Sequence, residues 1–456
     1  MLADDVLLEL FYFYVDQTWG GDGKKEIEGW QRLVHVCRRW RSVVFGSPRR
    51  LNLRLFCTAN TLARSMVDIW PALPLVIRGY DSINNLVALL ERSDLVRRIS
   101  QFDLWNVSSR KLEDILEAMQ VPFPELTHLL LHRDDETEPV LPLSDSFLGG
   151  SAPRLRSLNF YRIPYPGLSK LLLFSTHLSN LSLGGIPDSG YIPPEAMAVC
   201  LSTLTSLKQL NLEFEFPRFL PDQESQRPPP SIRTSLPVLD HFMFYGGGEY
   251  LEALVARMNA PQLRRLDITL FNDIVFVTPQ LTRFISRTPM FEAFDEARVT
   301  LRGWIASIEL SSAYAKLNAR LYVSIYCREL DWQLSFLEHV CTSPSPPLST
   351  LQDLYMMSDD PWPQDWKENI DYAQWLELLH SLSAAKNLYL SKKLAPCVVP
   401  ALHDLVGSRT TEVFPNLQNI FVEKLQESGL VQEGIGKFVA ARQVTSHPIT
   451  VSRWDR

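Results

Sequence analysis

A short apolar motif recurs along most of the chain and constrains the fold more than any other feature. In each copy an apolar residue is followed by two spacers, a second apolar residue, one spacer and a third apolar residue, often with a proline two places earlier. The second and third apolar residues are two apart, as on a short strand that buries alternate side chains. The first residues of the copies are Ile99, Leu126, Leu155, Leu178, Leu207, Leu239, Leu263, Leu351, Ala385 and Leu417, with degenerate copies at Phe291 and Leu321.

The spacing of the copies indicates a repeat. From Ile99 to Leu263 consecutive copies begin 23 to 32 residues apart, which overlaps the period of about 20–29 residues in leucine-rich repeats. Between copies, apolar residues three and four apart predict helices, for example Leu112–Met119, Leu251–Met258 and Trp375–Leu382. Neither a strand nor a helix of such a unit is buried alone, so units must stack.

The predicted fold is therefore α/β, an irregular leucine-rich-repeat solenoid with a curved parallel sheet inside and helices outside. A non-repetitive α/β domain whose leucines recur by chance is the alternative. The regular recurrence of the motif with its proline favours the repeat.

The first sixty residues follow a different pattern. Ala3–Val15 predicts an amphipathic helix, and a second helix is expected from about Glu28 to Phe45. We expect two parts: a helical domain over 1–58 with a Gly-rich insertion at 16–29, and a solenoid over 59–456 with proline-rich loops near 217–237 and 343–347.

Charge is concentrated near the N-terminus. Between Gly29 and Val67 there are eight arginines and no lysine, aspartate or glutamate. Since the whole chain has a formal net charge of −7, the remainder carries −15. Two interpretations of the arginine block compete: contact with nucleic-acid phosphates, or electrostatic attraction of an acidic protein partner.

Two segments in this region resemble the F-box. That motif typically opens with Leu-Pro, an acidic pair and a leucine-rich helix, and it closes with a Val-Cys-basic-basic-Trp helix. Two departures are Ala3, where the family has proline, and the 16–29 insertion, which is longer than the usual connection. The matching segments are Leu2-Ala3-Asp4-Asp5-Val6-Leu7-Leu8-Glu9-Leu10-Phe11 and Val36-Cys37-Arg38-Arg39-Trp40, followed by Pro48.

The chain as a whole, including its C-terminal block Val431–Asp455, is similar to the large fungal (mushroom-type) families of F-box proteins. This resemblance implies a substrate-recognition adaptor of an SCF-type cullin-RING ubiquitin ligase. Its F-box would dock on the small acidic adaptor subunit, and through it on the cullin, while the repeats bind a target protein. The residues expected to bind the adaptor subunit are Leu2, Ala3, Val6, Leu7, Leu10, Phe11, Leu33, Val36, Cys37 and Trp40.

Elementary physical chemistry agrees with this implication. A helical motif of sixty residues cannot bury all of its apolar side chains, so a partner must cover some of them. Arginines around an apolar patch suit an acidic protein, and nucleic acid is not expected as a partner. The alternative is a leucine-rich protein-binding module outside ubiquitylation, in which the degenerate F-box is only a structural cap.

No motif in the sequence indicates an enzyme, and we expect no catalytic residues, metal site or cofactor. The six cysteines are widely scattered, without the spacing of a zinc site or a disulfide framework. No segment approaches about 18 uncharged apolar residues, so no membrane partner is expected. A reduced compartment, cytoplasmic and/or nuclear, is the expected location.

Overall fold

The computed structural model of the chain describes residues 2–17, 29–58, 70–80, 86–134, 144–164, 168–215, 233–271, 278–312, 319–343, 348–358, 372–403, 413–424, 429–444 and 447–454. The chain divides into two compact units, Met1–Leu178 and Ser179–Arg456. Most of the predicted insertion at 16–29 and most of the proline-rich stretches at 217–237 and 343–347 lie outside the described residues.

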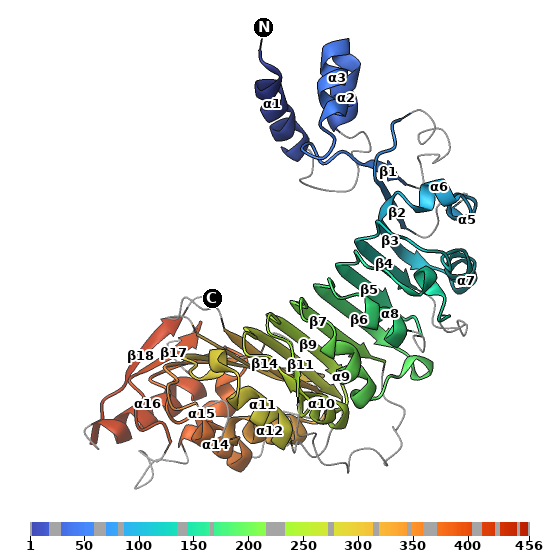
Figure 1. Cartoon of the computed structure of the whole chain (residues 1–456). Coiled ribbons are helices and arrows are strands. Elements are labelled where there is room, and N and C mark those ends of the chain that lie inside the picture. The colour runs from blue at the N-terminus through green and yellow to red at the C-terminus, as the bar shows by residue number, and fades with distance from the viewer. Residues whose placement is uncertain are drawn as a thin grey trace. The chain divides into compact units, whose positions relative to one another are not determined.

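The first unit begins with the helices α1 (Asp4–Gln17), α2 (Gly29–Val36) and α3 (Arg38–Gly46) (Figure 1). The prediction of one helix from about Glu28 to Phe45 was wrong, because Cys37 interrupts it. Cys37 has an extended backbone (φ −159°, ψ 168°), and its thiol accepts the N–H of Trp40 at 3.4 Å. A side chain that accepts the N–H three residues ahead is an N-cap, so α3 starts afresh at Arg38.

A parallel sheet follows in the same unit, with its five strands paired in chain order. It starts at Leu55, inside the range assigned above to the helical domain. Its strands are β1 (Leu55–Cys57), β2 (Leu75–Tyr80), β3 (Ile99–Val107), β4 (His128–Arg133) and β5 (Ser157–Tyr161). Short helices connect them: α5 (Leu86–Leu90), α6 (Ser93–Val96), α7 (Ser109–Ala118) and η1 (Phe147–Gly150). Helix α8 (Leu168–Phe174) follows β5.

The second unit has a longer sheet. In spatial order its strands are β6 (Asn180–Ile186), β7 (Gln209–Phe214), β9 (His241–Gly246), β11 (Arg265–Phe271), β14 (Arg320–Tyr326), β13 (Ile305–Ser311), β12 (Glu296–Arg302), β15 (Asp353–Met357), β16 (Asn387–Leu390), β17 (Asn419–Glu423) and β18 (Thr450–Trp454). A separate pair joins β8 (Thr234–Ser235) to β10 (Met258–Asn259).

Helices connect the strands of this second sheet, and Figure 1 shows them lying along one of its faces. They are η2 (Asp188–Gly190), α9 (Pro194–Ser202), α10 (Gly248–Val255), α11 (Pro279–Ser286), η3 (Pro289–Phe291), α12 (Leu330–Thr342), α14 (Tyr372–Ser381), α15 (Ala395–His403) and α16 (Leu430–Val444).

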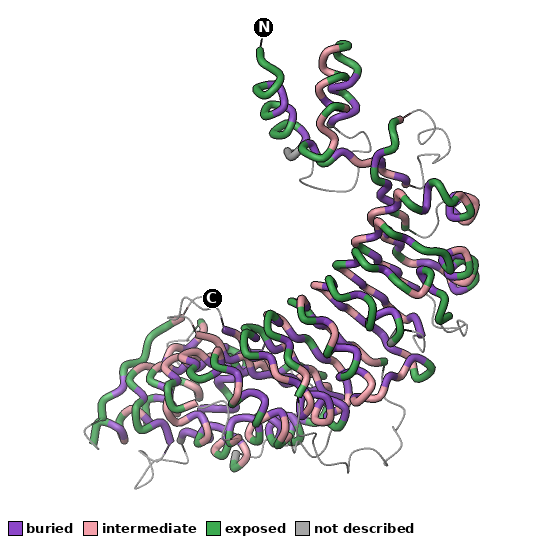
Figure 2. Tube along the Cα trace, viewed as in Figure 1, coloured by how far each residue is buried: buried purple, intermediate pink, exposed green. Residues whose placement is uncertain are grey.

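The repeat predicted from the motif is confirmed in both units. In β4, for example, Leu129 and Leu131 are buried while the residues between and beside them are not, and the same alternation recurs in β5, β16 and β17. Figure 2 draws this burial along the trace. In every full copy except the one at Ile99, which begins β3 itself, the first apolar residue ends a turn before the strand. Leu207 donates its N–H to the carbonyl of Leu204 at 3.0 Å, and Leu417 repeats this bond to Phe414 at 3.1 Å.

The expectation of an all-parallel stack fails at the degenerate copies near Phe291 and Leu321. Here β12, β13 and β14 form an antiparallel meander, so that β11 pairs with β14 and β15 pairs with β12. Only Gly303 and Trp304 separate β12 from β13. A parallel connection needs about a dozen residues, so the chain must turn back as a hairpin.

Two polar side chains tie helices to neighbouring repeats. Arg442 of α16 is fully buried and donates from Nη2 to the carbonyls of Phe414 (3.1 Å) and Pro415 (3.4 Å), in the turn before β17. Burial lowers the pKa of Arg442. Glu252 of α10 accepts the N–H groups of Gln280 (2.8 Å) and Leu281 (2.7 Å) at the start of α11, and burial raises the pKa of Glu252.

Candidate partner-docking site

Helix α1 is apolar on two opposite faces, which is unusual for a helix with water on one side. One face carries Leu7, Leu8, Phe11 and Val15, all buried. Phe11 packs against Trp40 of α3 with ring centroids 4.7 Å apart. This face holds α1 against the α2–α3 pair.

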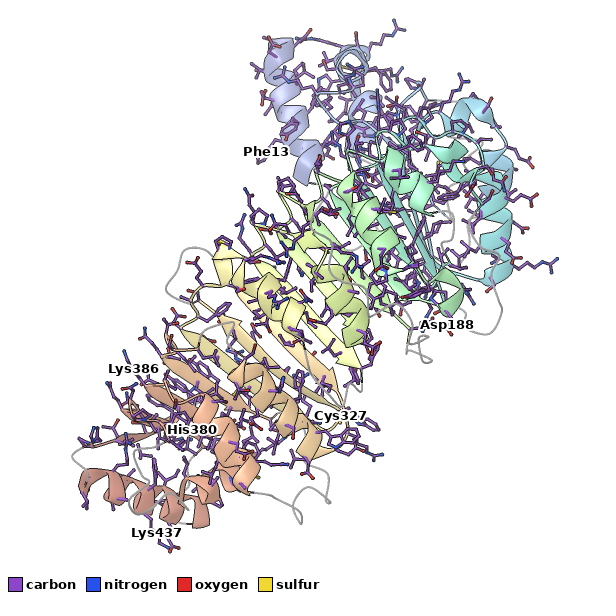
Figure 3. The ribbon with its side chains drawn as sticks, turned by 60° about the horizontal axis from the view of Figure 1, so that its bottom comes forward. Phe13, Asp188, Cys327, His380, Lys386 and Lys437 are labelled. Carbon is purple, nitrogen blue, oxygen red and sulfur yellow. The ribbon has the colours of Figure 1, made fainter. Side chains whose placement is uncertain are left out.

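The opposite face of α1 is exposed although it is apolar. Leu2, Val6, Leu10 and Phe13 recur at intervals of four, four and three residues, which places them on one stripe. Their exposed fractions are 54%, 46%, 53% and 65%. Phe13 is labelled in Figure 3, where it lies on the outer side of α1. We call these four residues the α1 stripe; it is an apolar surface that the described helices of this region leave uncovered.

The ten sequence-predicted residues differ in their exposure. Leu7, Phe11 and Leu33 are buried among the three N-terminal helices, so the expectation that Leu7 is exposed to a partner was wrong. The reason is that these side chains form the packing between the helices. Trp40 is half-buried against Phe11. The exposed members are Leu2, Ala3, Val6, Leu10, Val36 and Cys37.

Phe13 was missed by the sequence analysis, although its spacing from Leu10 continues the stripe. Val36 lies at the end of α2 with an exposed fraction of 59%. Cys37 is also exposed, but its thiol serves the N-terminus of α3, so its evident role is local.

Part of the arginine block is neutralised within the unit by acids that precede it in the sequence. Arg39 pairs with Asp4 (Nη2–Oδ1 2.7 Å), and Arg50 pairs with Glu9. The positive charge of the arginine block is therefore partly compensated, although the segment from Gly29 to Val67 itself contains no acidic residue. Arg32 and Arg38 are exposed and form no ion pair within the described residues. Positive charge therefore remains exposed on α2 at Arg32 and on α3 at Arg38.

An aromatic cluster fixes the α2–α3 pair to the chain that follows. Trp30 is buried, and its Nε1–H donates to the carbonyl of Arg54 at 3.1 Å. Its ring makes edge contacts with Phe45 (6.0 Å) and Trp70 (5.2 Å). A buried indole with its N–H satisfied gives α2 and α3 a rigid base.

The solvent face of the first sheet carries a row of rings near the ends of its strands. His132 stacks on Tyr161 with centroids 4.5 Å apart and planes within 2°, and Trp105 lies 5.5 Å from His132. The guanidinium of Arg162 lies 5.3 Å from the centre of the Tyr161 ring. Burial lowers the pKa of His132, which keeps this ring neutral near pH 7.

The second sheet has a similar row on its face. Tyr355, Tyr389 and Phe421 stack at 4.3 Å and 4.5 Å on adjacent strands, and Trp454 meets Tyr389 edge-on at 5.5 Å. Arg298 lies over Tyr355 at 5.4 Å. The first three occupy the spacer between the second and third apolar residues of the motif, so sequence reasoning could have found the row by comparing that position between copies.

Within the described residues, no group of three or more His, Cys, Asp or Glu side chains is placed to hold a metal ion. The helices in that part of the chain are all too short or too polar to cross a membrane.

Comparison with known proteins identifies no family for the chain. No protein-family model matches the chain, and no curated protein matches it. Among solved structures, the crystal structure of a TLR13–ssRNA13 complex is similar over 81% of this chain and 46% of that chain, with 14% identity and a TM-score of 0.33. The chain thus spans less than half the length of that structure, and a likeness this distant carries no information on ligands.

Proposed function

We propose that this chain is a substrate-recognition adaptor of an SCF-type ubiquitin ligase. The observation that carries the proposal is the α1 stripe: an amphipathic helix packed by one apolar face and leaving a second apolar face open. Such a face is typical of a helix that docks in the groove of a protein partner. The F-box resemblance of Leu2–Phe11 and Val36–Trp40 supports the adaptor subunit as that partner.

The charge of the neighbouring helices supports an acidic partner. Arg32 on α2 and Arg38 on α3 are exposed and form no ion pair within the described residues. Complementary charge at the rim of an interface raises the association rate more than the final affinity. The adaptor subunit of these ligases is acidic, so it matches both the apolar and the charged features.

The target would bind on the solvent faces of the sheets. Both faces present half-buried aromatic side chains flanked by an arginine, around Tyr161 and around Tyr355. Aromatic residues and arginine are the types that contribute most to protein–protein interfaces. The same faces would serve a leucine-rich binding module outside ubiquitylation, so the adaptor interaction is what distinguishes the two functions.

Binding of the purified full chain to the purified adaptor subunit tests the proposal. Val6→Asp and Leu10→Asp each place a charge on the stripe without touching the buried face of α1. Because burial of a full aliphatic side chain contributes about 1.5–3 kcal/mol, each change should weaken binding by about tenfold or more.

Val199→Asp is the matched control, since Val199 lies on α9 and is 60% exposed. It should leave adaptor binding unchanged. If the wild-type chain does not bind the adaptor subunit, or if both stripe variants bind as well as wild type, the ligase function is wrong and the module outside ubiquitylation takes its place.

A further inference from the structure

We infer that Arg39 and Arg50 are positioning residues that clamp the start of α1 onto α3 and onto the turn that follows α3, and so hold the α1 stripe in its docking geometry. The inference rests on the proposed function and goes beyond it. Under this inference Arg39 and Arg50 bind α1 within the chain instead of contacting a partner protein.

Arg39 makes the central contacts of the clamp. Its Nε and Nη2 both donate to Oδ1 of Asp4, at 3.1 Å and 2.7 Å, and Nη2 also donates to the carbonyl of Leu2. One guanidinium therefore binds the acid in the first turn of α1 and the backbone of the residue that opens the stripe. Planar guanidinium groups suit such multiple contacts because their N–H donors are held in a fixed fork.

Arg50 acts one turn further along α1. It pairs with Glu9 and lies 3.8 Å from Asp5 through Nη1. Asp4, Asp5 and Glu9 thus face two arginines that follow them by 35 to 45 residues. Together the contacts fix the helix along its first two turns, where Leu2 and Val6 lie.

The clamp acts at a helix start whose backbone no proline restricts. Residue 3 is alanine, whose φ is not restricted, and its carbonyl accepts the first helical bond from Leu7 at 3.1 Å. Leu2 and Val6 are about half exposed, so packing contributes little to their order. Without the clamp, docking would require the partner to order this turn, which reduces affinity.

The test compares three variants of the full chain with wild type by hydrogen–deuterium exchange and by binding kinetics with the adaptor subunit. Arg39→Met removes the clamp and keeps the side-chain length. Arg38→Met removes the same charge from the neighbouring residue, which forms no ion pair within the described residues. The double variant Ala3→Pro/Arg39→Met fixes φ at residue 3 without restoring the charge.

Arg39→Met should accelerate exchange in peptides covering residues 2–10 and weaken adaptor binding by about two- to fivefold, the range expected for an exposed ion pair. The double variant should recover wild-type affinity. Arg38→Met should leave the exchange of residues 2–10 unchanged. Recovery by a proline that adds no charge separates positioning from electrostatic attraction of the partner.

Three results overturn the inference: unchanged exchange in Arg39→Met, faster exchange with unchanged affinity, or a loss of affinity that Ala3→Pro does not restore. If wild type binds no adaptor subunit, the proposed function fails separately. Hydrogen–deuterium exchange then tests the clamp without a partner. Equal exchange of residues 2–10 in wild type and Arg39→Met would show that Arg39 does not clamp α1.

Discussion

Substitutions at Cys37 are expected to change the stability of α3 in the order Ser above Cys above Ala. The extended backbone of Cys37 and the 3.4 Å contact of its thiol with the Trp40 N–H make it the N-cap of α3. A hydroxyl accepts a hydrogen bond better than a thiol does, and serine is among the preferred N-cap residues, whereas alanine cannot accept one. Because Cys37 is exposed, these changes leave the packed core almost untouched.

The size of the effect follows from the cap alone. Replacing a good N-cap by alanine costs about 0.5–2 kcal/mol, and a thiol is a weak cap, so Cys37→Ala should lose about 0.5–1 kcal/mol. Cys37→Ser should gain a few tenths of a kcal/mol. For Cys37→Ala this loss of stability corresponds to an about two- to fivefold larger population of the locally opened state of α3, and so to faster exchange.

Hydrogen–deuterium exchange in peptides covering Arg38–Gly46 is the appropriate measurement, because it reports on α3 alone, whereas a global unfolding signal combines both compact units. Peptides from the second unit provide the internal control and should exchange alike in all variants.

The opposite order of α3 stability, with alanine above serine at residue 37, would show that Cys37 is not an N-cap. If α2 and α3 were one continuous helix, residue 37 would be an interior position, where alanine is the most stabilising residue and serine is less favourable. Exchange that slows in Cys37→Ala and quickens in Cys37→Ser would therefore show an unbroken helix and remove the basis for assigning Cys37 a local role.

Three further outcomes are expected. Arg442→Met should leave the carbonyls before β17 without their buried donor, destabilise that repeat by about 1–3 kcal/mol and quicken exchange in residues 413–424; equal exchange would contradict this. Glu252→Ala should remove the acceptor of two N–H groups at the start of α11 and quicken exchange in residues 279–286, while Glu249→Ala on the same helix should not. Burial lowers the pKa of His132, so as the pH falls the unfolded chain binds a proton at His132 before the folded chain does. The contribution of His132 to stability should therefore fall as the pH drops below about 6.5. His132→Phe keeps the stack and should remove that part of the pH dependence in the thermal unfolding of the chain; an identical dependence would show that His132 does not titrate as described.

The repeating part of the fold could be predicted from the sequence because its signal is local. Each copy of the motif buries three side chains within six residues, so Leu126, Leu129 and Leu131 show the strand without reference to any other copy. The helices between copies carry their own periodicity, and α7, α10 and α14 lie where it predicts them. Trp375 is fully buried on α14, as its position among leucines indicates.

The meander of β12, β13 and β14 could not be predicted from the same signal. Each of these strands has the alternation of a parallel strand, and the direction of a strand leaves no trace in its apolar pattern. Only the short Gly303-Trp304 connection excludes a crossover. The aromatic rows on the sheet faces were missed for a related reason: Tyr355 and Tyr389 occupy spacer positions, which become informative only when the pairing register is known.

The candidate docking site could be predicted only in part, because its position on α1 depends on how the helices pack together. From Val6 to Val15 nearly every side chain of α1 is apolar, so its periodicity cannot tell the packed face from the open one. That choice depends on which residues α2 and α3 present to it, among them Trp40, which packs against Phe11. Because Leu7 is buried and Val6 is exposed, a charge at Leu7 would unfold the three packed helices whether or not the chain binds a partner. A charge at Val6 changes only the open face, so loss of binding in Val6→Asp with wild-type exchange in α3 would be evidence of docking rather than of misfolding.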